Sequence, residues 1–167
     1  MREVAVGEPG EICVRGTLVM DGYWKRPEAT AEAFRGGWLH SGDVAVQDAE
    51  GYLYIVDRTK DMIISGGFNI YPAEIEACLL ELAGIRDVAV FGIPDDAYGE
   101  AIAAHVDPDP AAGLTETAVR EHVRGRLAAY KVPKVVVFDT ELPREESGKI
   151  FKRRIRERYW QAAGRNI

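Results

Sequence analysis

The chain has 167 residues, of which 47% are hydrophobic and 29% are charged, and its formal charge is −6. This composition is typical of a globular protein with one domain or slightly more, and the negative charge argues against a general binder of nucleic acid or of anionic membranes. No apolar run reaches the roughly 18 residues of a membrane span, and the N-terminus lacks an apolar signal segment, so a cytoplasmic protein is expected.

The first third of the chain is predicted to be rich in β-strands. Polar and apolar residues alternate at 11–15, which predicts a half-buried strand. Pro27 opens a short helix that ends near residue 34. The runs 43–47 and 52–56 flank a turn-forming Asp-Ala-Glu-Gly segment and predict a hairpin. Because these elements are too few for a full core, we expect them to be weakly ordered or to pair with a second copy.

The middle of the chain predicts a hairpin followed by a helix. Residues 62–64 are short, apolar and partly β-branched, as in a strand. Ser65-Gly66-Gly67 supplies the positive φ angles of a tight turn, and 68–71 can form the returning strand. Pro72 then begins an amphipathic helix. A plain hairpin and core helix would account for this stretch without any function.

The last part of the chain predicts alternating strands and helices. Two apolar runs indicate a central strand at 88–93 and a neighbouring strand at 101–106. Thr115 is a candidate N-cap for a helix that runs to residue 129. A further strand, a loop and a basic helix are expected at 135–138, 140–148 and 149–160. A β-rich unit is thus followed, after about residue 57, by a compact α+β domain.

Two loops carry polar groups suited to chemistry. Trp38-Leu39-His40-Ser41-Gly42-Asp43 ends in an aspartate, which in the simplest interpretation only opens a strand. Pro143-Arg144-Glu145-Glu146-Ser147-Gly148-Lys149 predicts a mobile glycine loop with one lysine, and Ser147 could equally be a helix N-cap. The second loop is not a Walker loop, because the pattern Gly-x-x-x-x-Gly-Lys-Ser/Thr is absent.

Three segments resemble core motifs of the adenylate-forming superfamily, in the correct order. The stretch Asp57–Glu76 resembles the eighth motif, in the form found in acyl-CoA synthetases. The segments Trp38–Asp43 and Pro143–Lys149 resemble the seventh and the tenth. Essentially the whole chain therefore resembles the C-terminal third of an acyl-CoA synthetase.

The resemblance implies roles for charged residues. Asp43 would accept hydrogen bonds from both ribose hydroxyls of ATP, since a carboxylate offers two acceptors to a vicinal diol. Arg58 would make a second contact to ribose or phosphate. Lys149 would be the catalytic cation of adenylation, where the acid, the α-phosphate and pyrophosphate are all anionic.

The resemblance also implies a division of the chain within an α+β fold. Residues 1–57 would be the β-rich end of the large domain's barrel subdomain. Residues 58–61 would be a hinge, with Lys60 at its centre, although a solvated surface lysine remains an alternative. Residues 62–167 would be the mobile C-terminal domain, with a three-stranded sheet, a β-hairpin and helices.

The turn of Ser65, Gly66 and Gly67 would let the pantetheine arm of CoA pass close to the backbone. Phe68 departs from the Glu that is common in closely related ligases. The family reaction converts acid, ATP and CoA to acyl-CoA, AMP and pyrophosphate through acyl-AMP, and a fatty acid is the expected substrate. The phosphate loop, the acid pocket and the Mg²⁺ site would belong to a missing N-terminal portion, so an isolated fragment is predicted to be inactive.

Two other classes of function stay open. A free-standing regulatory or nucleotide-binding module derived from this family would also fit the motifs. The basic last helix could indicate nucleic-acid binding, but the total charge is negative and no aromatic residues interleave with basic ones elsewhere. No metal site is expected, because His40, His105 and His122 are scattered. Both cysteines, Cys13 and Cys78, are expected to be reduced thiols.

Overall fold

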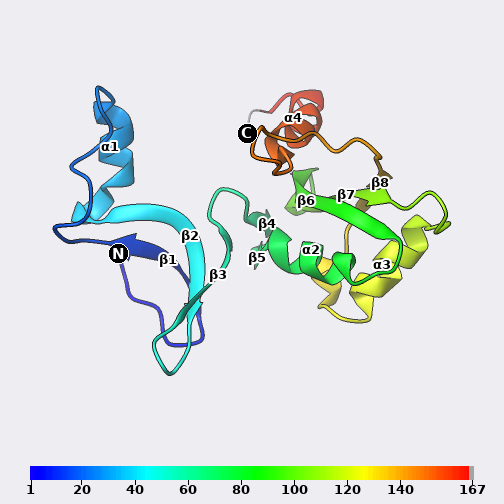
Figure 1. The fold of residues 1–167 in the computed structure, drawn as a ribbon, viewed down its shortest axis with the longest axis horizontal. Coiled ribbons are helices and arrows are strands. Elements are labelled where there is room, and N and C mark those ends of the chain that lie inside the picture. Colours follow the sequence, from blue (N-terminus) through cyan, green and yellow to red (C-terminus); the bar gives the residue numbers. More distant parts are fainter. Residues whose placement is uncertain (166–167) are drawn as a thin grey trace. The chain divides into compact units, whose positions relative to one another are not determined.

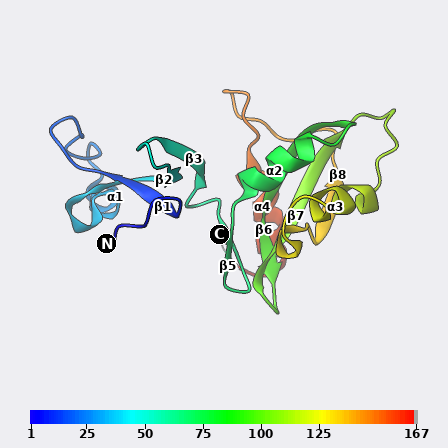
Figure 2. The ribbon, with the colours of Figure 1, turned by 90° about the horizontal axis from the view of Figure 1, so that it is seen from below.

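The computed structural model describes residues 1–165, and its chain divides into two compact units (Figures 1 and 2). Unit 1 is Met1–Lys60 and unit 2 is Asp61–Ile167, of which the last two residues lie outside the described part. None of the helices within 1–165 combines the length and the apolar character that a bilayer crossing requires.

Unit 1 contains a three-stranded antiparallel sheet in the order β1-β2-β3. Its strands are β1 (Pro9–Val14), β2 (Leu39–Gln47) and β3 (Leu53–Arg58). The expected hairpin forms and is longer than predicted. One helix, α1 (Pro27–Ala33), and the 3₁₀ turn η1 (Arg35–Gly37) lie between β1 and β2.

Unit 2 contains a sheet in the order β5-β4-β7-β6, with β8 paired in parallel to β7. Its elements in chain order are β4 (Ile63–Ser65), β5 (Phe68–Ile70), α2 (Pro72–Leu80), β6 (Ile85–Asp95), β7 (Gly99–Pro108), α3 (Glu116–Arg124), η2 (Ala129–Lys131), β8 (Val135–Phe138) and α4 (Lys152–Ala162). The predicted α+β class is confirmed. The expected three-stranded sheet and hairpin are joined into one five-stranded sheet, because β4 pairs with β7 at Ser65 and Gly99.

Helices cover both faces of the sheet in unit 2. Val88 and Val90 of β6 pack in the cluster that also holds α2 and α3, whereas Ala89 and Phe91 pack in the cluster with Ile155 of α4. Figure 1 shows α4 on one side of β6 and β7, with α2 and α3 on the other. The prediction of a central strand at 88–93 is wrong: β6 ends the sheet order and β7 is central. β6 is apolar on both faces because helices cover both of them.

Two predicted helix boundaries are also wrong. Thr115 caps α3 as expected, since its hydroxyl accepts from the Ala118 N–H, but α3 ends at Arg124 instead of continuing to 129. The chain turns at Gly125 and forms η2 before Pro133. The last helix begins at Lys152, so Lys149 lies in a loop and not in a helix.

Candidate functional site

The predicted nucleotide-binding turn lies on an irregular part of β2. The register against β1 shifts between His40 and Val44, and the register against β3 shifts between Val44 and Ala45. Gly42 has φ of 75°, a conformation that favours glycine. The Asp43 N–H donates to Ser41 Oγ at 3.0 Å. Ser41-Gly42-Asp43 therefore forms a bulged turn within β2, and bulges of this kind redirect side chains.

The structure brings Asp43 and Arg58 together. They are cross-strand partners of β2 and β3, and Arg58 Nε lies 3.0 Å from Asp43 Oδ1. Arg58 Nη2 also donates to the Ser41 carbonyl at 3.4 Å. Half of the Arg58 side chain and a third of the Asp43 side chain are exposed. The pair therefore presents a carboxylate and a guanidinium to solvent on one small surface.

A second polar cluster, consisting of Glu11, Cys13 and His40, supports this turn from β1. Glu11 Oε1 accepts from the Gly42 N–H at 3.2 Å, and Glu11 Oε2 lies 2.6 Å from His40 Nδ1. Cys13 Sγ is 3.6 Å from the same nitrogen, and His40 Nε2 is 3.2 Å from the Arg35 carbonyl oxygen. Burial raises the pKa of the Cys13 thiol, and the charge of Glu11 adds to this effect.

Lys60 is the last residue of unit 1, and Asp61 is the first residue of unit 2. The boundary between the compact units therefore falls within the segment 58–61. Lys60 lies in an exposed turn. Its role as a hinge stays a prediction.

Ser65, Gly66 and Gly67 form the turn of the β4–β5 hairpin. Gly66 and Gly67 have φ of 57° and 83°, and Ser65 pairs with Phe68 across the turn. This is the pattern of a two-residue hairpin loop with two positive φ angles. The Gly66 N–H donates to the Tyr98 carbonyl at 2.9 Å, which fixes the turn to the β6–β7 connection.

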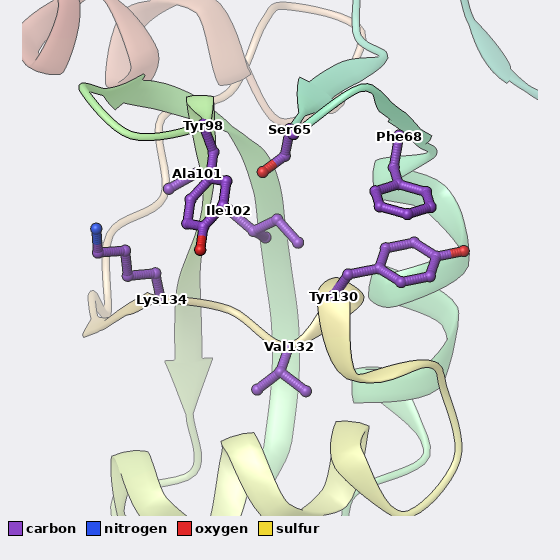
Figure 3. A pocket seen from close by; sticks show the side chains of 9 residues that line it. Ser65, Phe68, Tyr98, Ala101, Ile102, Tyr130, Val132 and Lys134 are labelled. Carbon is purple, nitrogen blue, oxygen red and sulfur yellow. The ribbon is translucent and has the colours of Figure 1, made fainter.

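The turn borders a pocket of about 360 Å³ (Figure 3). Its lining is mostly apolar and aromatic and comprises Ser65, Gly66, Phe68, Tyr98, Ala101, Ile102, Tyr130, Val132 and Lys134. Figure 3 shows the rings of Phe68 and Tyr130 lying face to face, with their centroids 4.6 Å apart. Phe68 therefore forms an apolar wall of this pocket.

One ion pair stands beside the pocket. Lys134 Nζ lies 2.5 Å from Asp95 Oδ2. The hydrogen bond from Lys134 lowers the pKa of the Asp95 carboxyl, and the same bond raises the pKa of Lys134. The Asp95 carboxylate also accepts from the backbone N–H groups of Ala97 and Tyr98, so it holds the β6–β7 turn in place.

Lys149 lies in a tight loop that is fixed at its base. Gly148 has φ of 82°, and its N–H donates to the Glu145 carbonyl at 2.9 Å. Arg144 donates to the Gly148 carbonyl and pairs with Asp87 of β6 at 2.5 Å. The Lys149 side chain is exposed, and among residues 1–165 no ion-pair partner of its ammonium is found.

The predicted site residues thus fall into three places: the Asp43–Arg58 pair, the Ser65–Gly67 turn and the Lys149 loop. Sequence reasoning missed the contribution of Tyr98, Tyr130 and Lys134 to the pocket, because they come from the β6–β7 and α3–β8 connections, which are distant in sequence from the β4–β5 turn. It also missed Glu11 and dismissed His40. A clue was available, since Glu11 and Cys13 occupy alternate positions of one predicted strand and thus one face.

Known proteins similar to this chain share both its sequence and its fold. Residues 74–149 match the family model of the AMP-binding enzyme C-terminal domain. A long-chain-fatty-acid–CoA ligase of Escherichia coli O157:H7 is 51% identical over 156 residues, which cover 93% of this chain and 28% of that protein. A feruloyl-CoA synthase of Amycolatopsis sp is 53% identical over 156 residues, covering 93% of this chain and 32% of the relative.

A solved structure is similar to this chain as well. The crystal structure of ATP-bound MatB from Rhodopseudomonas palustris superposes with a TM-score of 0.87 and 40% identity, over 95% of this chain and 32% of that one. The chain therefore spans only about a third of the length of the proteins that it matches. The chain carries, in residues 74–149, a C-terminal domain of the AMP-binding enzyme family.

Proposed function

We propose that this chain is the C-terminal part of an ATP-dependent acyl-CoA synthetase. The enzyme would join a carboxylic acid to ATP, giving acyl-AMP and pyrophosphate, and would then transfer the acyl group to CoA. Relatives named as long-chain-fatty-acid–CoA ligases support a fatty acid as the substrate, and the similarity to a feruloyl-CoA synthase makes an aromatic acid the second candidate.

The observation that carries this proposal is the Lys149 loop. Lys149 lies at the C-terminal end of this loop, where its carbonyl accepts from the Glu145 N–H and Arg144 fixes the base. Its exposed ammonium has no ion-pair partner among residues 1–165, so it can reach toward anionic groups without first leaving an ion pair. Such a cation stabilises the charge that develops when a carboxylate attacks the α-phosphate and pyrophosphate leaves.

The Asp43–Arg58 pair suits the ribose of ATP. A carboxylate has about four lone-pair sites, so Asp43 can keep its contact with Arg58 and still accept from two adjacent hydroxyls. Arg58 keeps donors that are available for a phosphate or ribose oxygen. Both side chains are partly exposed, which a binding surface requires.

The Ser65–Gly67 turn and its pocket suit the pantetheine arm of CoA. Gly67 faces open space, since a Cβ added there would meet no atom within 4 Å, so a ligand can lie against its backbone. A Cβ on Gly66 would approach Tyr98 to 3.2 Å and would crowd the pocket. Residues 58–61 would serve as the hinge that presents first Lys149 and then this turn.

The remaining parts of the site would lie outside these 167 residues. We place the phosphate loop, the acid pocket and the Mg²⁺ site in a preceding N-terminal portion. A cytoplasmic location belongs to the same proposal.

The test uses the longer protein that contains this chain and times its two half-reactions separately. Lys149→Ala should slow acyl-AMP formation by about 10²–10³, because one charge-stabilising donor is lost, and should leave thioester formation from supplied acyl-AMP nearly unchanged. Lys149→Arg, which keeps the charge, is the matched control and should retain more of the first step. Equal losses in both half-reactions would contradict the proposed role.

The 167-residue chain itself should release no pyrophosphate from ATP and acid, since most of the site is absent. Acid-dependent release by the purified chain would contradict this division of the site. Tight ATP binding by the isolated chain would instead favour the alternative, a free-standing nucleotide-binding or regulatory module.

A further inference from the structure

Three metal-ligating side chains meet on one face of the sheet in unit 1. They are Glu11, Cys13 and His40, whose ligand atoms all lie within 4.8 Å of one another. Cys13 and His40 are directly opposed in the β1–β2 register, and Glu11 is two residues before Cys13 on the same face. From this geometry we propose that the cluster binds a divalent cation of the zinc type.

The distances suit a tetrahedral ion. Zinc–sulfur and zinc–nitrogen bonds of about 2.3 and 2.0–2.1 Å, at a tetrahedral angle, separate S from N by about 3.6 Å. Cys13 Sγ and His40 Nδ1 are 3.6 Å apart. A zinc-bound N and O pair would be about 3.4 Å apart, whereas Glu11 Oε2 and His40 Nδ1 are 2.6 Å apart. The carboxylate must therefore rotate slightly, and the partial exposure of both side chains permits this.

The groups around the cluster orient its ligands. His40 Nε2 faces the Arg35 carbonyl at 3.2 Å, so the Nε2–H can donate there and the Nδ1 lone pair is directed at Cys13 and Glu11. Glu11 Oε1 accepts from the Gly42 N–H, which leaves Oε2 for the ion. A histidine whose second nitrogen is held by a carbonyl, and a carboxylate held by an N–H, are typical of metal sites.

Binding of the cation would be accompanied by the release of protons from its ligands. The ion would bind the Cys13 thiolate, the Nδ1 lone pair and one carboxylate oxygen, with water as the fourth ligand. The thiol proton, and any proton held between Nδ1 and Glu11 before the ion binds, would pass to solvent. No change of oxidation state is involved. The ion would tie β1 to β2 beside the turn that holds Asp43.

Cobalt(II) provides the first test, because a thiolate bound to Co²⁺ gives a charge-transfer absorption band. The 167-residue chain contains two cysteines, so such a band must come from Cys13 or Cys78. We expect the band in the wild type and in Cys78→Ser, and its loss in Cys13→Ser. Absence of the band from the wild type, or its persistence in Cys13→Ser, would overturn the proposal.

Zinc protection of the thiols provides a second test that does not depend on enzymatic activity. Zn²⁺ should slow alkylation of Cys13 at least about tenfold and leave Cys78 unaffected, as read by mass spectrometry of both peptides. Glu11→Gln keeps an oxygen for the Gly42 N–H but loses the charge, and His40→Gln removes the nitrogen ligand. Each should weaken Zn²⁺ binding by more than about tenfold, since even changes outside the ligand set cost 10–100-fold.

His122→Gln is the matched control, because His122 bonds the Cys78 carbonyl and lies outside the cluster. Circular dichroism of each variant checks that the chain is folded. Unchanged Zn²⁺ affinity in folded Glu11→Gln and His40→Gln would overturn the site, whatever the outcome for the synthetase activity.

Discussion

Unit 1 and unit 2 each contain a sheet, but they differ in what covers it. The sheet of unit 2 has an apolar cluster on each face, supplied by α2 and α3 on one side and α4 on the other. Among the described residues, the buried apolar side chains of unit 1 are those of Val44 and Ala45. Its edge strand β3 leaves Leu53 and Ile55 more than half exposed.

This difference shows where stability and where binding groups reside. Unit 2 has a complete core, so its Lys149 loop and Ser65–Gly67 turn can be exposed on a stable support. Unit 1 keeps its order mainly through backbone pairing and polar contacts around the Asp43 turn. Because large apolar side chains such as Leu53 and Ile55 are exposed in unit 1, we continue to predict that residues 1–57 are poorly anchored when alone.

The largest effect that separates the two units is expected from removing core volume from unit 2. Leu79 of α2 is fully buried, and Leu79→Ala should lower the free energy of unfolding of unit 2 by about 2–5 kcal/mol. The neighbouring Leu80 is 49% exposed, and Leu80→Ala is the matched control with an effect within about 0.5 kcal/mol. Hydrogen exchange measured on peptides of each unit should show the loss in unit 2. Similar effects of the two substitutions would contradict the assigned core.

Stiffening the joint between the units tests whether they act separately. Lys60→Pro fixes φ near −65° and removes a backbone donor. In the longer protein, adenylation should survive if the frozen pose is the first one, and transfer to CoA should fall by at least about tenfold. Lys60→Ala keeps the joint free and should behave as the wild type. Normal transfer in the proline variant would place the hinge elsewhere, with Arg58 or Asp61 as the next candidates.

The exposed strand of unit 1 predicts self-association of the isolated chain. Ile55 is 65% exposed on the edge strand β3, and burying such a side chain contributes about 1.5–3 kcal/mol. Ile55→Lys should therefore weaken self-association about tenfold or more, because edge lysines oppose strand pairing. Sedimentation at several concentrations measures this. If the wild type stays monomeric at all concentrations and the amides of unit 1 are protected from hydrogen exchange, the proposed difference between the two units is contradicted.

The smallest effect is expected from a buried histidine of unit 2. Burial lowers the pKa of His105, although Asp139 opposes this, and its Nε2 lies 2.9 Å from Tyr159 Oη. The unfolded chain therefore binds more protons just below the ordinary His pKa of about 6.5, so stability should fall as pH decreases through this range. Denaturant unfolding at pH 7 and pH 5 should show a smaller pH dependence in His105→Gln. An equal pH dependence would exclude His105 as its source.

The sequence by itself determined the element types and the family resemblance. Local chemistry sufficed for this: Pro27 and Pro72 open helices, Thr115 caps one, and Gly66 and Gly67 form a hairpin turn. These features depend on residues close in sequence, whose φ preferences and hydrogen bonds act within one turn. The motifs around Asp43 and Lys149 could be found for the same reason.

Only the tertiary structure decided the position of β6 at the end of the sheet, the length of α3 and the starting residue of α4. An apolar run shows that a strand is buried but not which elements bury it. Likewise, two contacts are made between residues of distant segments. His40 lies beside Glu11 and Cys13, and Phe68 stacks on Tyr130. Cross-strand register and loop packing bring them together, and no local spacing in the sequence encodes either.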